Sequence, residues 1–247
     1  MQFTSIQRVD MRRRGFLVSI ALLIGSVTVA KAKVIWGGMP WTGKASAAPQ
    51  PVVADGWKFF TAGEAELVAA LSDRIIPADE LSIGGKEAGC AVFIDAQLAG
   101  AYGKGSYLYL DGPLKQGLPQ AGPQFKEGPA ARWRAGLAAF DSAVKAKSGK
   151  PFVALTPAEQ DMMIGQWEAG TLPMSGVDAK QFFNLVLWNV REGYFSDPIY
   201  GGNKNMAGWK MLGFPGAQYD FRDYIDKPGQ KLDIKPVSFI RKPTQTT

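Results

Sequence analysis

Apolar residues recur at helical spacing behind two short polar start signals in this chain. One signal, Thr61-Ala62-Gly63-Glu64, places a carboxylate three residues after a hydroxyl; the other, Thr156-Pro157-Ala158-Glu159, adds proline at the first helical position. Such capping boxes satisfy the free backbone N–H groups of a helix start. The apolar positions behind the first signal are Leu67, Val68, Leu71 and Ile75. We therefore predict helices after residues 61 and 156, with Pro77 ending the first.

Three further segments have a helical pattern. One runs from about Lys86 to Gln97, and another begins near Pro129 and ends before Gly149. The apolar stripe of the latter is Trp133, Leu137, Phe140 and Val144. The last runs from about Asp178 to Tyr194 and is apolar almost all round, which predicts a central buried helix. Together the segments predict a mainly α fold, a small domain of about five helices joined by long loops.

The chain beyond Asp197 shows no sustained helical or alternating pattern for about fifty residues, which is long for a loop in a compact domain. It nevertheless carries large aromatic residues: Trp209, Phe214, Tyr219, Phe221, Tyr224 and Phe239. We predict an extended C-terminal tail from about residue 197 that needs a surface to lie on. That surface is either another subunit or the chain's own helices.

The first 47 residues have the pattern of an export signal and linker. Arg13-Arg14-Gly15-Phe16-Leu17 opens an apolar run to Ala30. At about fifteen residues, this run is shorter than the roughly 20 that span a bilayer. Ala45-Ser46-Ala47 offers a cleavage site, so we expect a removed signal, with an uncleaved anchor as the alternative. The paired arginines Arg13 and Arg14, with Phe16 and Leu17, resemble a twin-arginine signal, which implies export of a folded protein by the twin-arginine translocase.

The positive charge of the chain belongs to this leader. The whole sequence has 28 basic and 22 acidic residues, a formal charge of +6. Residues 1–47 hold seven basic residues and one acidic residue, which leaves 21 of each in residues 48–247. A formally neutral domain gives no support for a nucleic-acid partner or for electrostatic membrane binding.

The composition excludes most cofactor and catalytic sites. Histidine is absent and Cys90 is the single cysteine, so imidazole metal sites, haem attachment through Cys-x-x-Cys-His and histidine-based triads cannot form. Neither Gly-x-Gly-x-x-Gly nor Gly-x-Ser-x-Gly occurs. We expect no cofactor, metal or catalytic residue in this chain. For Cys90 a buried thiol is favoured over a reactive thiol or an intermolecular bridge.

Carboxylates are the remaining acid–base candidates. They occur at Asp79-Glu80, Glu192 and Asp197, and in the tail at Asp220, Asp223 and Asp226. A two-carboxylate glycosidase could be built from such a set. The nearby arginines Arg74, Arg191 and Arg222 favour structural ion pairs instead.

Two regions resemble the gluconate 2-dehydrogenase subunit 3 family. The first comprises residues 73–79 (DRIIPAD), 85–89 (GKEAG) and 93–98 (FIDAQL). The second is residues 191–217, REGYFSDPIYGGNKNMAGWKMLGFPGA, which is similar to that family's most characteristic stretch.

The resemblance implies that this chain is the small, gamma subunit of a membrane-associated periplasmic dehydrogenase. The chain itself would be held at the membrane indirectly, through the other subunits of the complex. Its partners would be a large FAD-containing subunit, which selects the sugar acid, and a multihaem cytochrome c subunit. The small subunit would assist maturation and carry the export signal. A periplasmic carbohydrate-active enzyme acting alone and a module that binds a small ligand are the alternatives.

The second region is our candidate subunit interface. Its glycines allow tight turns, and its aromatic side chains are the type that dominates interface energetics. The candidate residues are Arg191, Tyr194, Phe195, Asp197, Tyr200, Asn203, Trp209 and Phe214.

Overall fold

The computed structural model describes residues 52, 56–108, 110, 112–113, 115, 117–118, 120, 125–218 and 220–239. Within these ranges the fold is mainly α, as predicted, and no strand is formed apart from one isolated bridge. The helices are α2 (Ala62–Ile75), α3 (Cys90–Ala99), α4 (Ala101–Lys104), α5 (Pro129–Ser148), α6 (Pro157–Glu168), α7 (Ala179–Phe195) and α8 (Ala207–Leu212). The predicted signal, including Arg13, Arg14, Phe16 and Leu17, lies outside the described residues and stays a prediction.

Both predicted capping boxes form. In the first, the Thr61 backbone N–H donates to the Glu64 carboxylate at 2.8 Å, and the Glu64 N–H donates to the Thr61 hydroxyl at 3.3 Å. The box at Thr156 and Glu159 repeats this exchange at 2.7 and 3.4 Å. These local contacts fix the starts of α2 and α6, which explains why they could be located from the sequence.

The prediction for the second helix was wrong at its start. Instead of beginning near Lys86, α3 begins at Cys90, because Gly89 has a left-handed backbone (φ 82°) that a helix cannot contain. A side-chain carbon at Gly89 would lie 2.6 Å from the Gly201 carbonyl oxygen. The glycine is therefore needed both for the turn and for the close approach of the tail.

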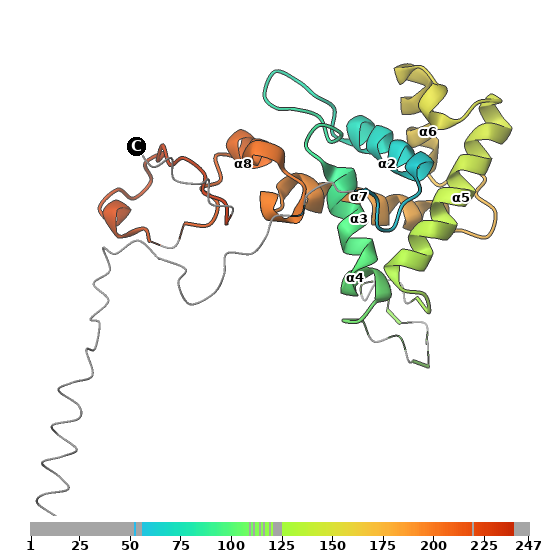
Figure 1. The fold of residues 1–247 in the computed structure, drawn as a ribbon, viewed down its shortest axis with the longest axis horizontal. Coiled ribbons are helices and arrows are strands. Elements are labelled where there is room, and N and C mark those ends of the chain that lie inside the picture. The colour runs from blue at the N-terminus through green and yellow to red at the C-terminus, as the bar shows by residue number, and fades with distance from the viewer. Residues whose placement is uncertain are drawn as a thin grey trace, which may run out of the picture. The chain divides into compact units, whose positions relative to one another are not determined.

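Helix α7 is central to the domain, and α2, α3, α5 and α6 all contact it (Figure 1). An aromatic cluster fills the space between α5, α6 and α7, with Trp167 packed against Phe140 and Phe182 at ring-centroid distances of 4.6 and 5.3 Å. The predicted central position of α7 is confirmed, but the helix is not buried on every side. One face is open, and Trp188 on it is 62% exposed, because no element among the described residues covers that face.

The stretch that leads into α2 is held by one buried carboxylate. Asp95 on α3 accepts the backbone N–H groups of Lys58, Phe59 and Phe60 at 2.8–2.9 Å. Phe60 is buried beside Trp133, so this carboxylate connects the start of the domain to its core.

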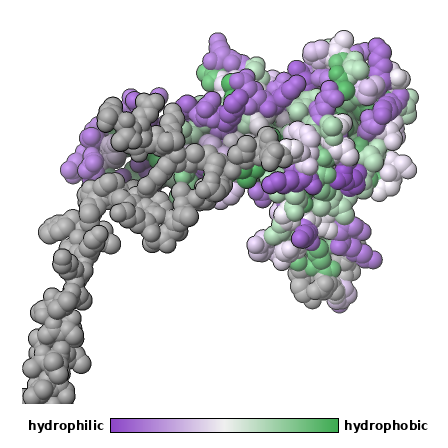
Figure 2. Space-filling model, in the orientation of Figure 1, coloured by the Kyte–Doolittle hydropathy of each residue, from purple (hydrophilic) through white to green (hydrophobic). Residues whose placement is uncertain are grey.

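Exposed apolar residues also occur away from α7. Tyr107 and Leu108 follow α4 and are both exposed. Figure 2 shows hydrophobic surface at the end of the domain where α4 lies.

Among the described residues, no helix is long and apolar enough to cross a membrane.

Candidate functional site

Burial divides the eight candidate interface residues into three groups. Four are buried in the chain itself: Tyr194, Asp197, Asn203 and Trp209. Phe195 is half-buried, and the exposed members are Arg191, Tyr200 and Phe214. Only the exposed members can contact a partner without rearrangement, so the predicted interface stays a prediction that rests on them.

The buried members hold the segment onto the end of α7. The Tyr194 hydroxyl lies 2.7 Å from both the Ser82 hydroxyl and the Ile83 carbonyl oxygen. The Trp209 indole N–H donates to the carbonyl of Phe195 at 2.7 Å, which fixes α8 against α7. These contacts make the beginning of the tail part of the helical domain.

Asn203 organises the turn between α7 and α8. Its amide nitrogen donates to the Ser196 carbonyl at 2.8 Å, and its amide oxygen accepts the Gly208 N–H at 2.9 Å. Asn203, Asn205 and Met206 all have positive φ, at 46°, 56° and 57°. For a residue with a long side chain such as Met206 this conformation costs about 1–2 kcal/mol. Strain of this kind gathers at functional segments, which directs attention to the surface beside Met206.

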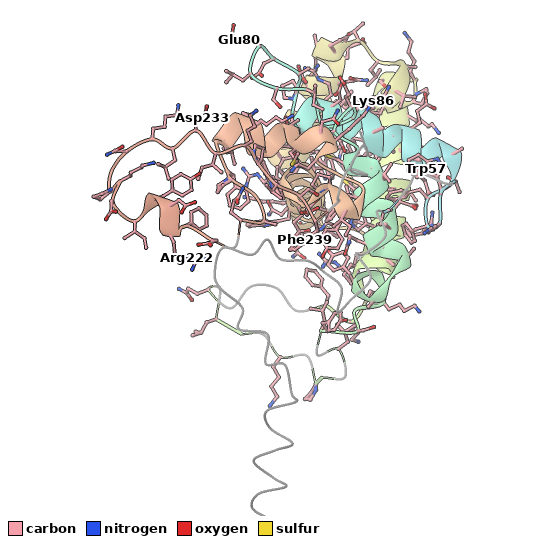
Figure 3. All side chains as sticks on the ribbon, turned by 60° about the vertical axis from the view of Figure 1, so that its left-hand side comes forward. Trp57, Glu80, Lys86, Arg222, Asp233 and Phe239 are labelled. Carbon is pink, nitrogen blue, oxygen red and sulfur yellow. The ribbon has the colours of Figure 1, made fainter. Side chains whose placement is uncertain are left out.

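Asp197 ties the far end of the tail to the end of α7. Its Oδ1 accepts the Ile199 N–H at 2.9 Å and the Ser238 hydroxyl at 2.7 Å. Its Oδ2 accepts the Phe239 N–H at 3.0 Å. We call this set of contacts the Asp197 clasp. It closes the tail into a loop, which Figure 3 shows carrying Arg222 and Asp233 before the chain returns to the helices at Phe239.

A groove of about 870 Å³ lies between α8 and the extended stretch 231–236. We call it the tail groove. Its apolar lining comes from both sides: Met206, Trp209, Met211, Leu212, Phe214, Leu232, Ile234 and Pro236. Lys210, Lys231, Asp233 and Lys235 supply its charged groups. The sequence prediction found Trp209 and Phe214 but missed the residues of 231–236, although Leu232, Ile234 and Pro236 alternate with charged residues and could have indicated an extended segment.

No described residue from Lys210 to Phe239 is buried. The stretch nevertheless exposes seven large apolar side chains: Met211, Leu212, Phe214, Phe221, Ile225, Val237 and Phe239. A segment that buries so little has no core of its own, whereas large apolar side chains gathered at a surface are typical of contact sites. The tail up to Trp209 therefore lies on its own helices, and the part beyond it presents an open surface.

Four of the seven acid–base candidates have structural partners among the described residues: Asp79, Glu192, Asp197 and Asp220. Arg74 pairs with Asp161 at 2.5 Å, Arg222 pairs with Asp220, and Asp79 accepts the N–H groups of Leu81 and Ser82. Hydrogen bonds from Arg222 bring the pKa of Asp220 down to about 2. Among the described residues, no group of three or more acidic or cysteine side chains is placed to hold a metal ion.

Cys90 is buried at the start of α3. Burial raises the pKa of its thiol to about 12, so it stays protonated at neutral pH. Its sulfur lies 3.6 Å from the Val190 carbonyl oxygen. The expectation of a buried thiol is met.

The helical part of the chain matches a family of known proteins. The model of the family described as gluconate 2-dehydrogenase subunit 3 matches residues 62–216, from the first residue of α2 to just past α8. No curated protein and no solved structure matches the chain. The matched range includes the whole candidate interface, whereas residues 217–239 of the loop closed by the Asp197 clasp lie beyond it.

Proposed function

This chain belongs to the gluconate 2-dehydrogenase subunit 3 family, and from that membership we propose that it is the small, non-catalytic subunit of a periplasmic sugar-acid dehydrogenase. A gluconate 2-dehydrogenase subunit implies partner subunits. In our proposal these are a large FAD-containing subunit, which oxidises the substrate, and a multihaem cytochrome c subunit, which takes the electrons. The small subunit stabilises the flavin subunit and brings it through the twin-arginine translocase to the outer face of the cytoplasmic membrane.

One observation carries this proposal beyond the family match. Residues 210–239 expose seven large apolar side chains, and no described residue among them is buried. An isolated monomer gains nothing from such a surface, whereas a subunit that must hold a partner needs it. The hydrogen-bonded acidic groups and the protonated Cys90 thiol give no comparable support to a catalytic role.

The export role is tested on the paired arginines. We replace Arg13 and Arg14 together by lysine, and in a matched control replace Arg8 and Arg12 by lysine, which changes the same chemistry outside the pair. Both variants are made in cells that also produce the flavin and cytochrome subunits. We expect the first variant alone to leave flavin-dependent dehydrogenase activity in the cytoplasm. Periplasmic activity that is equal in both would contradict the export role.

The subunit role is tested by recovering the tagged chain from membranes and recording flavin and haem spectra of the eluate. Tyr200 is 50% exposed, so Tyr200→Ala should reduce the flavin and haem recovered while the chain stays folded. Trp209 is only 6% exposed and bonded to Phe195, so Trp209→Ala should lower the melting temperature of the chain itself. An eluate of the unaltered chain without flavin would contradict the subunit role.

A further inference from the structure

The stretch 231–237 is extended, with side chains that alternate between two faces. Lys231, Asp233 and Lys235 are exposed, whereas Leu232 and Ile234 between them are half-buried against the tail groove. Alternation with a period of two is the geometry of a β-strand, although no sheet surrounds this one. The stretch therefore has one apolar face, which lines the tail groove, and one charged face.

One backbone edge of this stretch is occupied at its C-terminal end. Val237 donates its N–H to the Pro215 carbonyl at 3.1 Å and accepts the Ala217 N–H at 2.7 Å. On the same edge, the Lys235 carbonyl accepts the Gln218 side chain at 3.4 Å. In an extended chain, backbone groups of residues two apart point the same way, so the odd-numbered residues face this edge.

The opposite edge carries the backbone groups of Leu232 and Ile234. Within the part of the chain that the structure describes, neither residue has a backbone hydrogen bond on that edge. A row of free N–H and C=O groups beside an apolar surface is a template for another strand. A strand paired there would lie about 4.8 Å away, and its alternate side chains would point to the face shared with the tail groove.

We propose that this free edge binds an extended segment of the partner subunit by adding it as a β-strand, with apolar side chains of that segment in the tail groove. This inference rests on the proposed function, because it names the contact through which that function is exerted. Three lysines (Lys210, Lys231 and Lys235) border the groove against one acid, Asp233, so the added segment carries acidic residues between its apolar ones.

Charge also argues against a second copy of this chain as the occupant. Antiparallel pairing of two copies about Asp233 would place Lys231 directly opposite Lys235 at both ends, and like charges opposite each other destabilise a strand pair. An acidic segment from a different chain would meet the same lysines favourably.

Backbone hydrogen exchange distinguishes strand addition from docking by side chains alone. We compare the full-length chain with its complex purified from membranes and follow the amides of Leu232 and Ile234. In the free chain we expect them to exchange almost as fast as in an unfolded peptide, and in the complex at least tenfold more slowly. The Val237 amide, bonded to Pro215 in the free chain, is the internal reference.

Each outcome decides a different point. Fast exchange of Leu232 and Ile234 in an intact complex would overturn the strand addition and leave the subunit role standing. Failure to recover any complex would remove the proposed function and this inference with it. Protection that appears in the purified chain alone and grows with its concentration would identify a second copy as the occupant, against the proposal.

Two proline variants test the edge by mutation. Leu232→Pro removes an N–H from the free edge, whereas Asp233→Pro removes one that points to the opposite edge, the edge that Val237 uses, and leaves the free edge intact. We expect Leu232→Pro to reduce the recovered complex at least tenfold and Asp233→Pro to reduce it less than threefold. Equal losses, or no loss with Leu232→Pro, would overturn the proposal. Replacing Lys231 and Lys235 by glutamate should reduce the amount of complex recovered more strongly at low salt than at high salt.

Discussion

The Asp197 clasp predicts that the end of the tail can be released without unfolding the helical domain. In Asp197→Asn, an amide nitrogen takes the place of one carboxylate oxygen. The amide oxygen can still accept the Ile199 N–H from the Oδ1 position, so the new nitrogen takes the Oδ2 position. There it faces the Phe239 N–H, which in the unaltered chain donates to Oδ2 at 3.0 Å. The variant therefore loses one hydrogen bond to a charged group and gains a donor facing a donor.

The loss can be estimated from that one bond. A hydrogen bond to a charged group contributes about 1.5–3 kcal/mol, which corresponds to roughly a 10- to 100-fold rise in the fraction of molecules with the clasp open. Because no described residue from Lys210 to Phe239 is buried, the end of the segment is otherwise held by hydrogen bonds of Val237 and Lys235 and not by a core. We expect the effect to stay local, with a change in the melting temperature of less than about 2 °C.

Asp95→Asn is the matched control, because Asp95 also accepts three hydrogen bonds, in its case from backbone N–H groups that lead into the core. The same 1.5–3 kcal/mol lost there should lower the melting temperature by about 3–12 °C. Circular dichroism measures melting, and hydrogen exchange at the Phe239 amide measures opening of the clasp. Our reasoning is refuted if Asp197→Asn melts as low as Asp95→Asn, or if the Phe239 amide exchanges no faster than in the unaltered chain.

Three further predictions concern the core. Trp133 and Trp167 are both fully buried, but of the two only Trp133 has a hydrogen-bond partner for its ring N–H. Trp133→Phe should therefore lower the free energy of urea unfolding by about 1 kcal/mol more than Trp167→Phe. Equal losses would contradict this. Burial raises the pKa of the Cys90 thiol to about 12, so between about pH 9 and pH 12 the unfolded chain loses this proton and the folded chain keeps it. The stabilisation that Cys90 contributes is therefore complete below pH 9 and falls as the pH rises above it, and Cys90→Ala should flatten that fall. The native thiol should also resist alkylation at pH 8. At Gly89 both the left-handed backbone and the nearby Gly201 carbonyl oxygen oppose a side chain, so Gly89→Ala should lower the free energy of unfolding by more than 1 kcal/mol. Gly63, in open space on α2, is the control, and Gly63→Ala should raise that free energy by about 0.5–1 kcal/mol. An unchanged stability of Gly89→Ala would contradict this.

The helices were predictable where their signals are local. A capping box involves residues three apart, and an apolar stripe repeats within one helix, so α2, α5 and α6 could be placed from the residues they contain. The start of α3 could not be placed in this way. It depends on the left-handed backbone of Gly89, which lies close to Gly201, a residue more than a hundred positions later in the chain. The open face of α7 was missed for a related reason: Trp188 is apolar, but no element packs over it.

The sequence by itself determined the fold class and the family, and it singled out residues 191–217 as the candidate interface segment, because each of these rests on residue types and short spacings. The tertiary structure alone decided which side chains of that segment remain available. The buried Tyr194 is hydrogen-bonded to Ser82, 112 residues earlier, and Asp197 accepts a hydrogen bond from Phe239, 42 residues later. Burial depends on such distant partners, whose positions are set by how the helices pack, and no local pattern in the chain specifies them.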